Sequence, residues 1–230
     1  MRPVILFLLI FFALTACSGP HHVILGSESR HGWAGKKTEI ILDAKIDKLK
    51  VRHVRRRAPR CASGQKDHIE IAGFIGPDST ASLERLLPKL DDCILANGVK
   101  EVNDVYLSSG GGLLSDGYEL GRLFRKYKVG TVITGGQKCA SSCAVAFLGG
   151  KFRTMSFDAE LLFHAPYLNK GVAIDCSDRG QVAGLLKYYK QMLGDKEGSY
   201  LLERTMNYCS ATEGWTLNSG GAKLFDIVTD

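Results

Sequence analysis

Two adjacent serines between two cysteines form the part of the sequence best suited to covalent chemistry. Residues 136–150 read GQKCASSCAVAFLGG, so Ser141 and Ser142 open a run of small apolar residues that predicts a buried helix over about 141–148. One interpretation is structural: a serine caps the helix and a disulfide staples it. The other is chemical, because N–H groups at a helix start stabilise the negative charge that forms when a serine attacks a carbonyl.

A serine nucleophile needs a base, and the sequence offers His164 at the end of an apolar run. Residues 161–166 read LLFHAP, a pattern typical of a buried strand with the histidine at its carboxyl end. Functional sites gather at that end of the strands in open α/β sheets. A histidine among apolar residues can equally be a packed core residue. His164 is therefore a candidate base, provided that the fold brings it to Ser141.

Three consecutive glycines supply a third element. Residues 107–112 read LSSGGG and lie between a predicted strand and a predicted helix. Glycines at such a junction let the backbone come close to another group and direct its N–H groups at it, as an oxyanion site requires. The alternative is a flexible turn. A dinucleotide site is not predicted, because the GxGxxG spacing is missing.

The elements that position these residues alternate between strands and helices. Apolar residues at every second position predict strands, apolar residues at helical spacing predict helices, and Pro88 is expected to kink or split the helix that contains it. The expected strands are 67–74, 102–107, 129–134, 151–155 and 160–164, with a short strand-like run at 39–42, and the expected helices are 79–96, 114–127, 141–148, 180–193 and 199–207. This order predicts an α/β fold with a largely parallel sheet in a single domain.

The first residues predict export from the cytoplasm. Arg2 precedes an apolar run from Val4 to Leu14 that is too short for a membrane span and is typical of a signal peptide. The run ends in Leu-Thr-Ala-Cys, which resembles the bacterial lipobox, so we expect a lipoprotein signal peptide over 1–16 and acylation of Cys17. The alternative is an ordinary secretory signal. With acylation we expect a lipid-anchored protein of the bacterial cell envelope that faces the periplasm, and without it a secreted or periplasmic protein.

Six cysteines remain after Cys17, an even number that suggests three disulfides in an oxidising compartment. Six cysteines allow fifteen pairings. Order along the chain suggests Cys61 with Cys93, Cys139 with Cys143, and Cys176 with Cys209. The middle pair closes only if the backbone turns between its cysteines. The spacing lacks the paired clusters of a zinc site, and we expect neither a metal nor a cofactor.

The net charge of +6 is concentrated in residues 45–60, KIDKLKVRHVRRRAPR. Nucleic acid is not an expected partner of an exported chain. We expect residues 17–60 to form a lipid-anchored basic tether and the folded domain to cover 61–230. Within the tether, the segment 45–60 would contact anionic lipid or cell-wall polymer, or remain a solvated linker without a partner.

Taken in order, the three elements resemble the Clp-protease-type serine peptidases of the Clp/crotonase fold, in particular the exported bacterial branch with a CAS(S/A)C segment. In that family a strand leads into S-P-G-G, a later segment reads G-Q-A-A-S-M, and a later strand ends I-H-Q-P. The counterparts here are SSGG at 108–111, GQKCASS at 136–142 and FHAP at 163–166, within a resemblance that covers about 67–230. It implies superhelical ββα units, a peptide or protein substrate, and a homo-oligomer assembled through the later helices.

The resemblance also implies a role for each site residue. Ser141 would be the nucleophile, because the Ala-Ser order matches the family, whereas choosing Ser142 shifts the match by one position. His164 would be the general base. The backbone N–H of Ser142, together with that of Gly110 or Gly111, would receive the oxyanion.

The chain departs from the family pattern at two places. Ser109 stands where the family has proline. The family's acid precedes an aromatic residue by two positions, which makes Glu213 the candidate acid before Trp215. Without that acid the site is a Ser-His dyad, and a Ser-Lys dyad through Lys138 or Lys151 is a further alternative.

The function expected from these residues is that of an envelope serine hydrolase, a peptidase that works through an acyl-enzyme. Because folds do not dictate chemistry, the competing expectation is a non-catalytic envelope lipoprotein that uses the same fold as a binding or assembly module.

Overall fold

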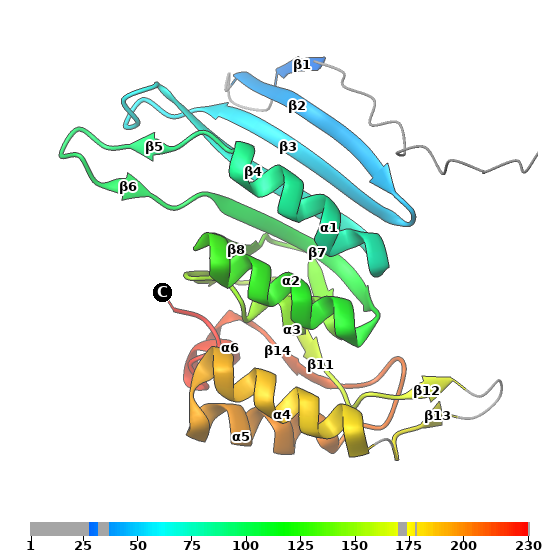
Figure 1. The fold of residues 1–230 in the computed structure, drawn as a ribbon. Coiled ribbons are helices and arrows are strands. Elements are labelled where there is room, and N and C mark those ends of the chain that lie inside the picture. Colours follow the sequence, from blue (N-terminus) through cyan, green and yellow to red (C-terminus); the bar gives the residue numbers. More distant parts are fainter. Residues whose placement is uncertain (1–27, 32–36, 170–173, 178, 230) are drawn as a thin grey trace, which may run out of the picture.

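The computed structural model describes residues 28–31, 37–169, 174–177 and 179–229 (Figure 1). The predicted signal peptide over 1–16 and the predicted lipidation site Cys17 lie outside the described residues. Across the described ranges, no helix has the length and apolar character that a membrane span requires.

One large sheet organises these residues. Its antiparallel part consists of β1 (Glu28–His31), β2 (Lys37–Ile46), β3 (Leu49–Arg57) and β4 (Gln65–Ile75). From β4 onward the neighbours are parallel, through β7 (Asp104–Gly112), β9 (Lys138–Ala140) and β11 (Glu160–Phe163), and β14 (Trp215–Leu217) ends the order antiparallel. A parallel branch of β8 (Gly130–Ile133) and β10 (Arg153–Met155) also leaves β7. The predicted single α/β domain with a largely parallel sheet is confirmed.

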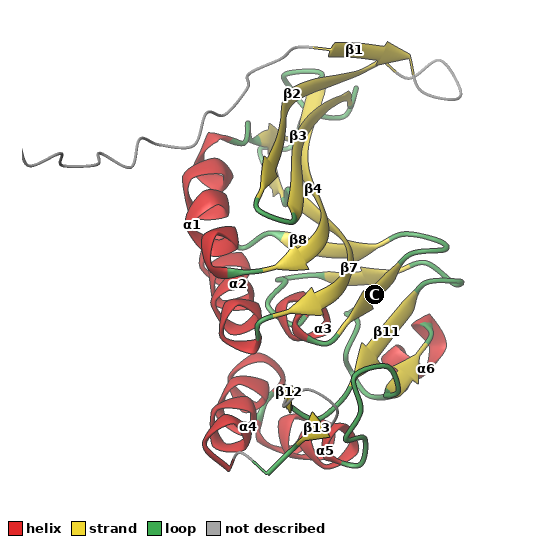
Figure 2. Cartoon of the chain, turned by 90° about the vertical axis from the view of Figure 1, so that its right-hand side faces the viewer, coloured by secondary structure: helices red, strands yellow, loops and turns green. Residues whose placement is uncertain are grey.

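Helices cover this sheet. They are α1 (Pro77–Leu86), the 3₁₀ turn η2 (Leu87–Lys89), α2 (Leu114–Tyr127), α3 (Ser142–Phe147), α4 (Arg179–Leu193), α5 (Asp195–Met206) and α6 (Ser219–Leu224). Two small antiparallel pairs are β5 (Cys93–Ile94) with β6 (Lys100–Glu101), and β12 (Leu168–Asn169) with β13 (Ile174–Asp175). Figure 2 shows α1, α2 and α4 one above another along one side of the sheet.

Periodicity predicts some elements well and overextends one. α2 occupies its predicted range, and its apolar stripe of Leu120, Leu123 and Phe124 is buried. The helix predicted over 79–96 is shorter, because α1 ends at Leu86 and Pro88 lies in the 3₁₀ turn that follows. Proline lacks the N–H that would continue the α-helical hydrogen bonds, so the chain goes on only as a short 3₁₀ turn.

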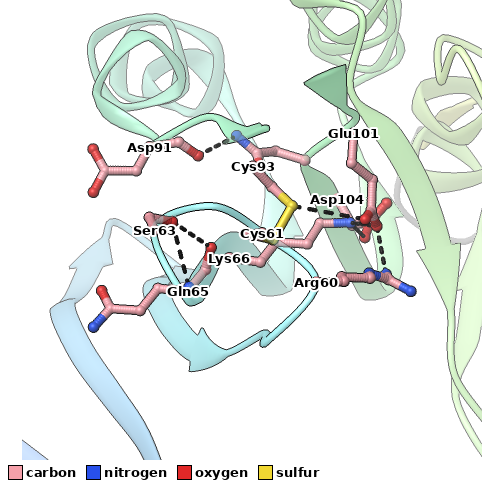
Figure 3. The surroundings of a disulfide bond; sticks show 10 residues. Arg60, Cys61, Ser63, Gln65, Lys66, Asp91, Cys93, Glu101 and Asp104 are labelled. Atoms are coloured by element: carbon pink, nitrogen blue, oxygen red, sulfur yellow. Dashed lines mark hydrogen bonds and ion pairs between the residues drawn. A yellow bond between two sulfur atoms is a disulfide. The ribbon is translucent and has the colours of Figure 1, made fainter. Parts of the chain in front are cut away.

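The three predicted disulfides are confirmed: Cys61 bonds to Cys93, Cys139 to Cys143, and Cys176 to Cys209. Figure 3 shows the first, which ties the β3–β4 connection to β5. The carboxylate of Glu101 lies beside this disulfide and accepts hydrogen bonds from Arg60 at 2.5 Å and from Lys66 at 2.7 Å. Because the two sulfurs are bonded to each other, the group formed by Cys61, Cys93 and Glu101 offers a metal no thiolate.

The predicted tether over 17–60 is wrong for its second half, and the folded domain does not begin at Cys61. Residues 37–57 form the β2–β3 hairpin, and β3 pairs with β4 along its whole length. Leu49 and Val51 are buried in the main core, whereas Lys50 between them is exposed. Buried and exposed residues therefore alternate in LKVRHV, as in a half-buried strand. The many charged residues around this stretch are typical of a linker and conceal that pattern.

Four basic residues of 45–60 face carboxylates of the same domain, namely Lys50, Arg52, Arg55 and Arg60. Arg52 pairs with Asp43 at 3.1 Å and with Glu70 at 3.5 Å. Arg55 pairs with Asp67 and Asp91. These ion pairs give part of the charged run a structural partner inside the protein, whereas contact of this segment with anionic lipid or cell-wall polymer stays a prediction.

Asp67 is the buried centre of this charge network. Its carboxylate is fully buried and accepts hydrogen bonds from His53 Nε2 at 2.9 Å, Arg55 Nε at 2.8 Å and the backbone N–H of Asp91 at 2.9 Å. Burial alone would raise the pKa of Asp67, but these donors outweigh burial and hold the pKa well below its usual range. The network joins β3 and β4 to the segment that follows η2.

We expect Asp67→Asn to lower the free energy of unfolding at pH 7 by about 3 kcal/mol, because it removes the charge that compensates buried donors. Asp43→Asn, at an exposed ion pair, should change it by less than about 1 kcal/mol. Urea unfolding with the disulfides intact measures both. A depressed carboxyl pKa stabilises the folded state above the unfolded pKa of about 3.9, so the cost of Asp67→Asn should persist down to about pH 4 and shrink as the pH falls further. Equal urea midpoints at pH 7 for wild type and Asp67→Asn would contradict this account.

Candidate active site

Ser141 lies at the sharp junction between β9 and α3 and has an unusual backbone conformation. Its φ of 58° and ψ of −127° place a non-glycine residue in a sparsely populated region. Such a conformation costs about 1–3 kcal/mol and persists only where the surroundings enforce it. Here the Ser141 N–H donates to the Leu162 carbonyl at 2.9 Å, and its carbonyl accepts from the Val145 N–H at 3.1 Å. Its side chain makes no capping hydrogen bond, so the interpretation of this serine as a simple helix cap does not hold.

The two serines have different environments. Ser141 is partly exposed, whereas Ser142 is 1% exposed and its Oγ is buried without a hydrogen-bond partner. Ser142 is pressed against α2, where a Cβ added to Gly117 would lie 2.9 Å from the Ser142 Cβ. Of the two serines, only Ser141 is in part exposed to solvent, and the hydroxyl of Ser142 is buried.

Covalent and polar contacts hold both ends of α3. The Cys139–Cys143 disulfide joins β9 to the first turn of α3 across Ser141, and both cysteines are fully buried. At the other end, Arg125 of α2 donates to the carbonyls of Leu148 and Gly149, each at 3.0 Å. These bonds satisfy carbonyls that a helix end leaves unpaired.

A second arginine anchors the segment after α3. Arg153 is buried and donates from Nε to the carbonyl of Ile227 at 2.6 Å. Burial, together with the nearby Arg125, lowers the pKa of Arg153 to about 10, which keeps the guanidinium charged at neutral pH. Neither arginine could be identified from the sequence, because their partners are backbone carbonyls, which no residue pattern reports.

The glycine turn at the end of β7 packs directly against Ser141. A Cβ added to Gly111 would lie 2.7 Å from the Ser141 Cβ, 2.7 Å from the Ala140 carbonyl oxygen and 3.1 Å from the Ser142 nitrogen. Gly111 also has a φ of 104°, which residues that carry a side chain rarely adopt. Its N–H donates to Ser109 Oγ at 2.9 Å. Gly110 is exposed, and a Cβ added there would meet nothing within 4 Å.

His164 follows the strand that pairs with β9. Leu162 stands opposite Ala140 in the parallel β9–β11 ladder, so Ser141 and His164 both leave the sheet at its carboxyl edge. The imidazole is partly exposed, and its ring centroid lies 5.5 Å from that of Tyr167. Nδ1 lies 2.9 Å from the carbonyl oxygen of Ala165. Because a carbonyl only accepts, Nδ1 carries the proton of the neutral ring and Nε2 is left as the acceptor. In this conformation no hydrogen bond joins the two described side chains of Ser141 and His164.

The predicted acid does not reach the histidine. Glu213 is exposed, and its backbone N–H donates to Ser210 Oγ at 3.0 Å. No hydrogen bond or ion pair joins the described side chains of Glu213 and His164, although β14 begins two residues after Glu213 and pairs with β11. The group that orients the imidazole here is instead the carbonyl of Ala165, which motif spacing could not identify.

The alternative lysines have other partners. Lys138 Nζ lies 3.6 Å from the Glu160 carboxylate, and both side chains are about half exposed. Lys151 Nζ lies 5.2 Å from the centroid of the Phe152 ring. Neither lysine makes a hydrogen bond to Ser141 in the described part of the chain, and each has another partner close by.

We expect Gly111→Ala to destabilise the folded protein by about 2 kcal/mol, because the new Cβ meets backbone atoms at a strained φ. Gly110→Ala is the matched control at the neighbouring position, where space is open, and should change stability by less than about 1 kcal/mol. Urea unfolding of both variants makes the comparison. Similar midpoints for Gly111→Ala and Gly110→Ala would show that the turn is not closely packed against Ser141.

Comparison with known proteins identifies the fold. No family model matches the sequence, and no curated protein matches it. Two solved structures of the 1510-N membrane-bound stomatin-specific protease, a serine-to-alanine mutant and a lysine-to-alanine mutant in complex with a substrate peptide, each align with a TM-score of 0.53 at 16% identity. The alignments cover 69% of this chain and 75% and 71% of those chains. ClpP1 from Listeria monocytogenes aligns with a TM-score of 0.49 at 16% identity, over 69% of this chain and 86% of that chain. The chain therefore shares the fold of the stomatin-specific protease.

Proposed function

We propose that this protein is a serine hydrolase of the peptidase type, with Ser141 as nucleophile and His164 as general base. The observation that carries the proposal is the enforced conformation of Ser141, a partly exposed residue at a strained strand-to-helix junction that packs against the glycine turn. An alcohol presented in this way, beside backbone N–H groups, is suited to acyl transfer.

The proposed reaction proceeds through an acyl-enzyme. Ser141 Oγ attacks the scissile carbonyl carbon while His164 Nε2 takes the hydroxyl proton, and the oxyanion is held by the backbone N–H groups of Ser142 and Gly110. We choose Gly110 over Gly111 because the N–H of Gly111 is already bonded to Ser109. The C–N bond then breaks as His164 returns the proton to the leaving amine, and a water activated by the same imidazole hydrolyses the ester.

The dyad replaces the predicted triad in this proposal. The Ala165 carbonyl holds Nδ1–H and so selects the tautomer in which Nε2 can accept a proton. A neutral carbonyl stabilises the imidazolium less than a carboxylate does. The site needs a side-chain movement of Ser141 or His164 to form their hydrogen bond, which is common because catalytic hydrogen bonds often tighten when substrate binds.

The peptide substrate and the cellular setting belong to the same proposal. One of the structures of the stomatin-specific protease contains a substrate peptide, which supports a peptide or protein as the substrate of this chain. We further propose that the protein is lipid-anchored and faces the periplasm. We also propose that it forms a homo-oligomer, and light scattering after size-exclusion chromatography would distinguish an oligomer from a monomer.

A fluorophosphonate probe tests the nucleophile and base. We expect wild type to be labelled at neutral pH, Ser141→Ala to lose labelling completely and Ser142→Ala to retain it. His164→Ala should lower the labelling rate by at least about a hundredfold, because an unassisted serine hydroxyl is a weak nucleophile. Intact-protein mass spectrometry and peptide mapping locate the adduct.

The same series separates the alternatives. Glu213→Gln and Lys138→Ala should be labelled within about threefold of the wild-type rate, because neither side chain contacts the site. Loss of labelling in Lys138→Ala with retention in His164→Ala would replace the Ser-His dyad by a Ser-Lys site. An unlabelled, folded wild-type protein would favour the non-catalytic envelope module.

Lipidation is tested at Cys17. Cells fed a labelled fatty acid should incorporate it into the wild-type chain, because the proposed processing makes Cys17 the acylated N-terminus. Cys17→Ser should lose both the label and retention in the membrane fraction. Equal incorporation in both chains would show that the precursor is not processed as a lipoprotein.

A further inference from the structure

We propose that Ser109 is a positioning residue of this site: its hydroxyl, inserted between β4 and β7, holds the glycine turn against Ser141. The inference deepens the proposed function and rests on it for its catalytic consequence. It concerns the position at which the chain departs from the proline of the family that it resembles.

The position of Ser109 follows from an irregularity in the β4–β7 ladder. Ala72 pairs with Ser108, but the next partners are Phe74 and Gly111. One residue of β4, Gly73, therefore stands opposite two residues of β7, Ser109 and Gly110. An extra residue of this kind is a β-bulge, which interrupts the ladder hydrogen bonds and redirects the strand.

The Ser109 hydroxyl bridges the interruption. It donates to the Gly73 carbonyl and accepts the Gly111 N–H at 2.9 Å, so one side chain connects two backbone groups on the two strands. Ser109 is 7% exposed, and its own backbone pairs with Cys139 on β9. A hydroxyl can serve as donor and acceptor at once, which neither alanine nor proline can do through its side chain.

The bridge connects the N-terminal hairpin to the nucleophile. The N–H of Phe74 donates to the Lys48 carbonyl at 3.1 Å, and a Cβ on Gly73 would lie 2.2 Å from that oxygen, so the β2–β3 turn holds Gly73 in place. Ser109 relates Gly73 to Gly111, and Gly111 touches the Ser141 backbone segment. Loss of the hydroxyl would free Gly111 to shift, and with it the oxyanion donors that the turn presents.

The test compares Ser109→Ala with Ser109→Thr, which keeps a hydroxyl, and with Ser108→Ala as matched control. Ser108 Oγ contacts Gln137 at 2.5 Å and not the bridge. In the full mature chain, the maximal rate of fluorophosphonate inactivation should fall by at least about tenfold in Ser109→Ala, with the half-saturating probe concentration unchanged. Ser109→Thr and Ser108→Ala should stay within about threefold of wild type. A Ser109→Ala rate within threefold of wild type would overturn the inference.

A second measurement does not depend on reactivity. In wild type the Gly111 amide should be protected from hydrogen exchange, as measured by NMR. In Ser109→Ala the exchange rate of that amide should be at least about tenfold higher. If wild type does not react with the probe, the proposed function fails and this measurement alone decides the bridge. If Ser109→Ala does not fold, the wild-type amide decides: protection at Gly111 supports the bridge, and an unprotected Gly111 overturns it.

Discussion

Close packing of a glycine turn against the Ser141 junction is the constraint on which the rest of the site depends. Gly111 approaches the backbone of β9 and α3 so closely that no side chain fits between them. Ser141 in turn has a backbone conformation that an unsupported serine would leave, because its cost is not repaid locally. The turn, the disulfide that spans Ser141 and the hydrogen bond to β11 together enforce that conformation. Ser141 is therefore partly exposed, while Ser142 is buried.

The support for this arrangement extends well beyond the site. The β2–β3 hairpin contacts the end of β4, and the buried network around Asp67 fixes the hairpin to β4 and to the segment after η2. A buried carboxylate with three donors is a poor source of net stability but a strict geometric requirement, since each partner becomes costly if another is removed. The charged N-terminal segment thus belongs to the frame that holds the glycine turn.

The chemistry of His164 depends on a backbone group. A carbonyl that accepts from Nδ1–H selects the tautomer that a base needs, but supplies no negative charge to balance the imidazolium. The partial exposure of the ring allows water to share that role. This arrangement suits a hydrolase whose rate depends strongly on how well the backbone donors are placed, which is where Ser109 and the glycine turn act.

The sequence by itself was enough to determine the α/β class, the range of α2 and the chain order of glycines, serines and histidine, because these depend on local periodicity and spacing. It suggested the three cysteine pairs only by their order along the chain, and the structure decided among the fifteen possible pairings. The prediction of a tether was wrong for 45–57, which forms strands. Charged residues hid the alternation of buried and exposed positions there, and their partners, such as Asp67, Glu70 and Asp91, come later in the chain. Only the tertiary structure decided which serine is accessible, that Glu213 stays apart from His164, and that Ser109 bridges two strands. Each of these depends on contacts between segments whose relative placement no single stretch of residues encodes.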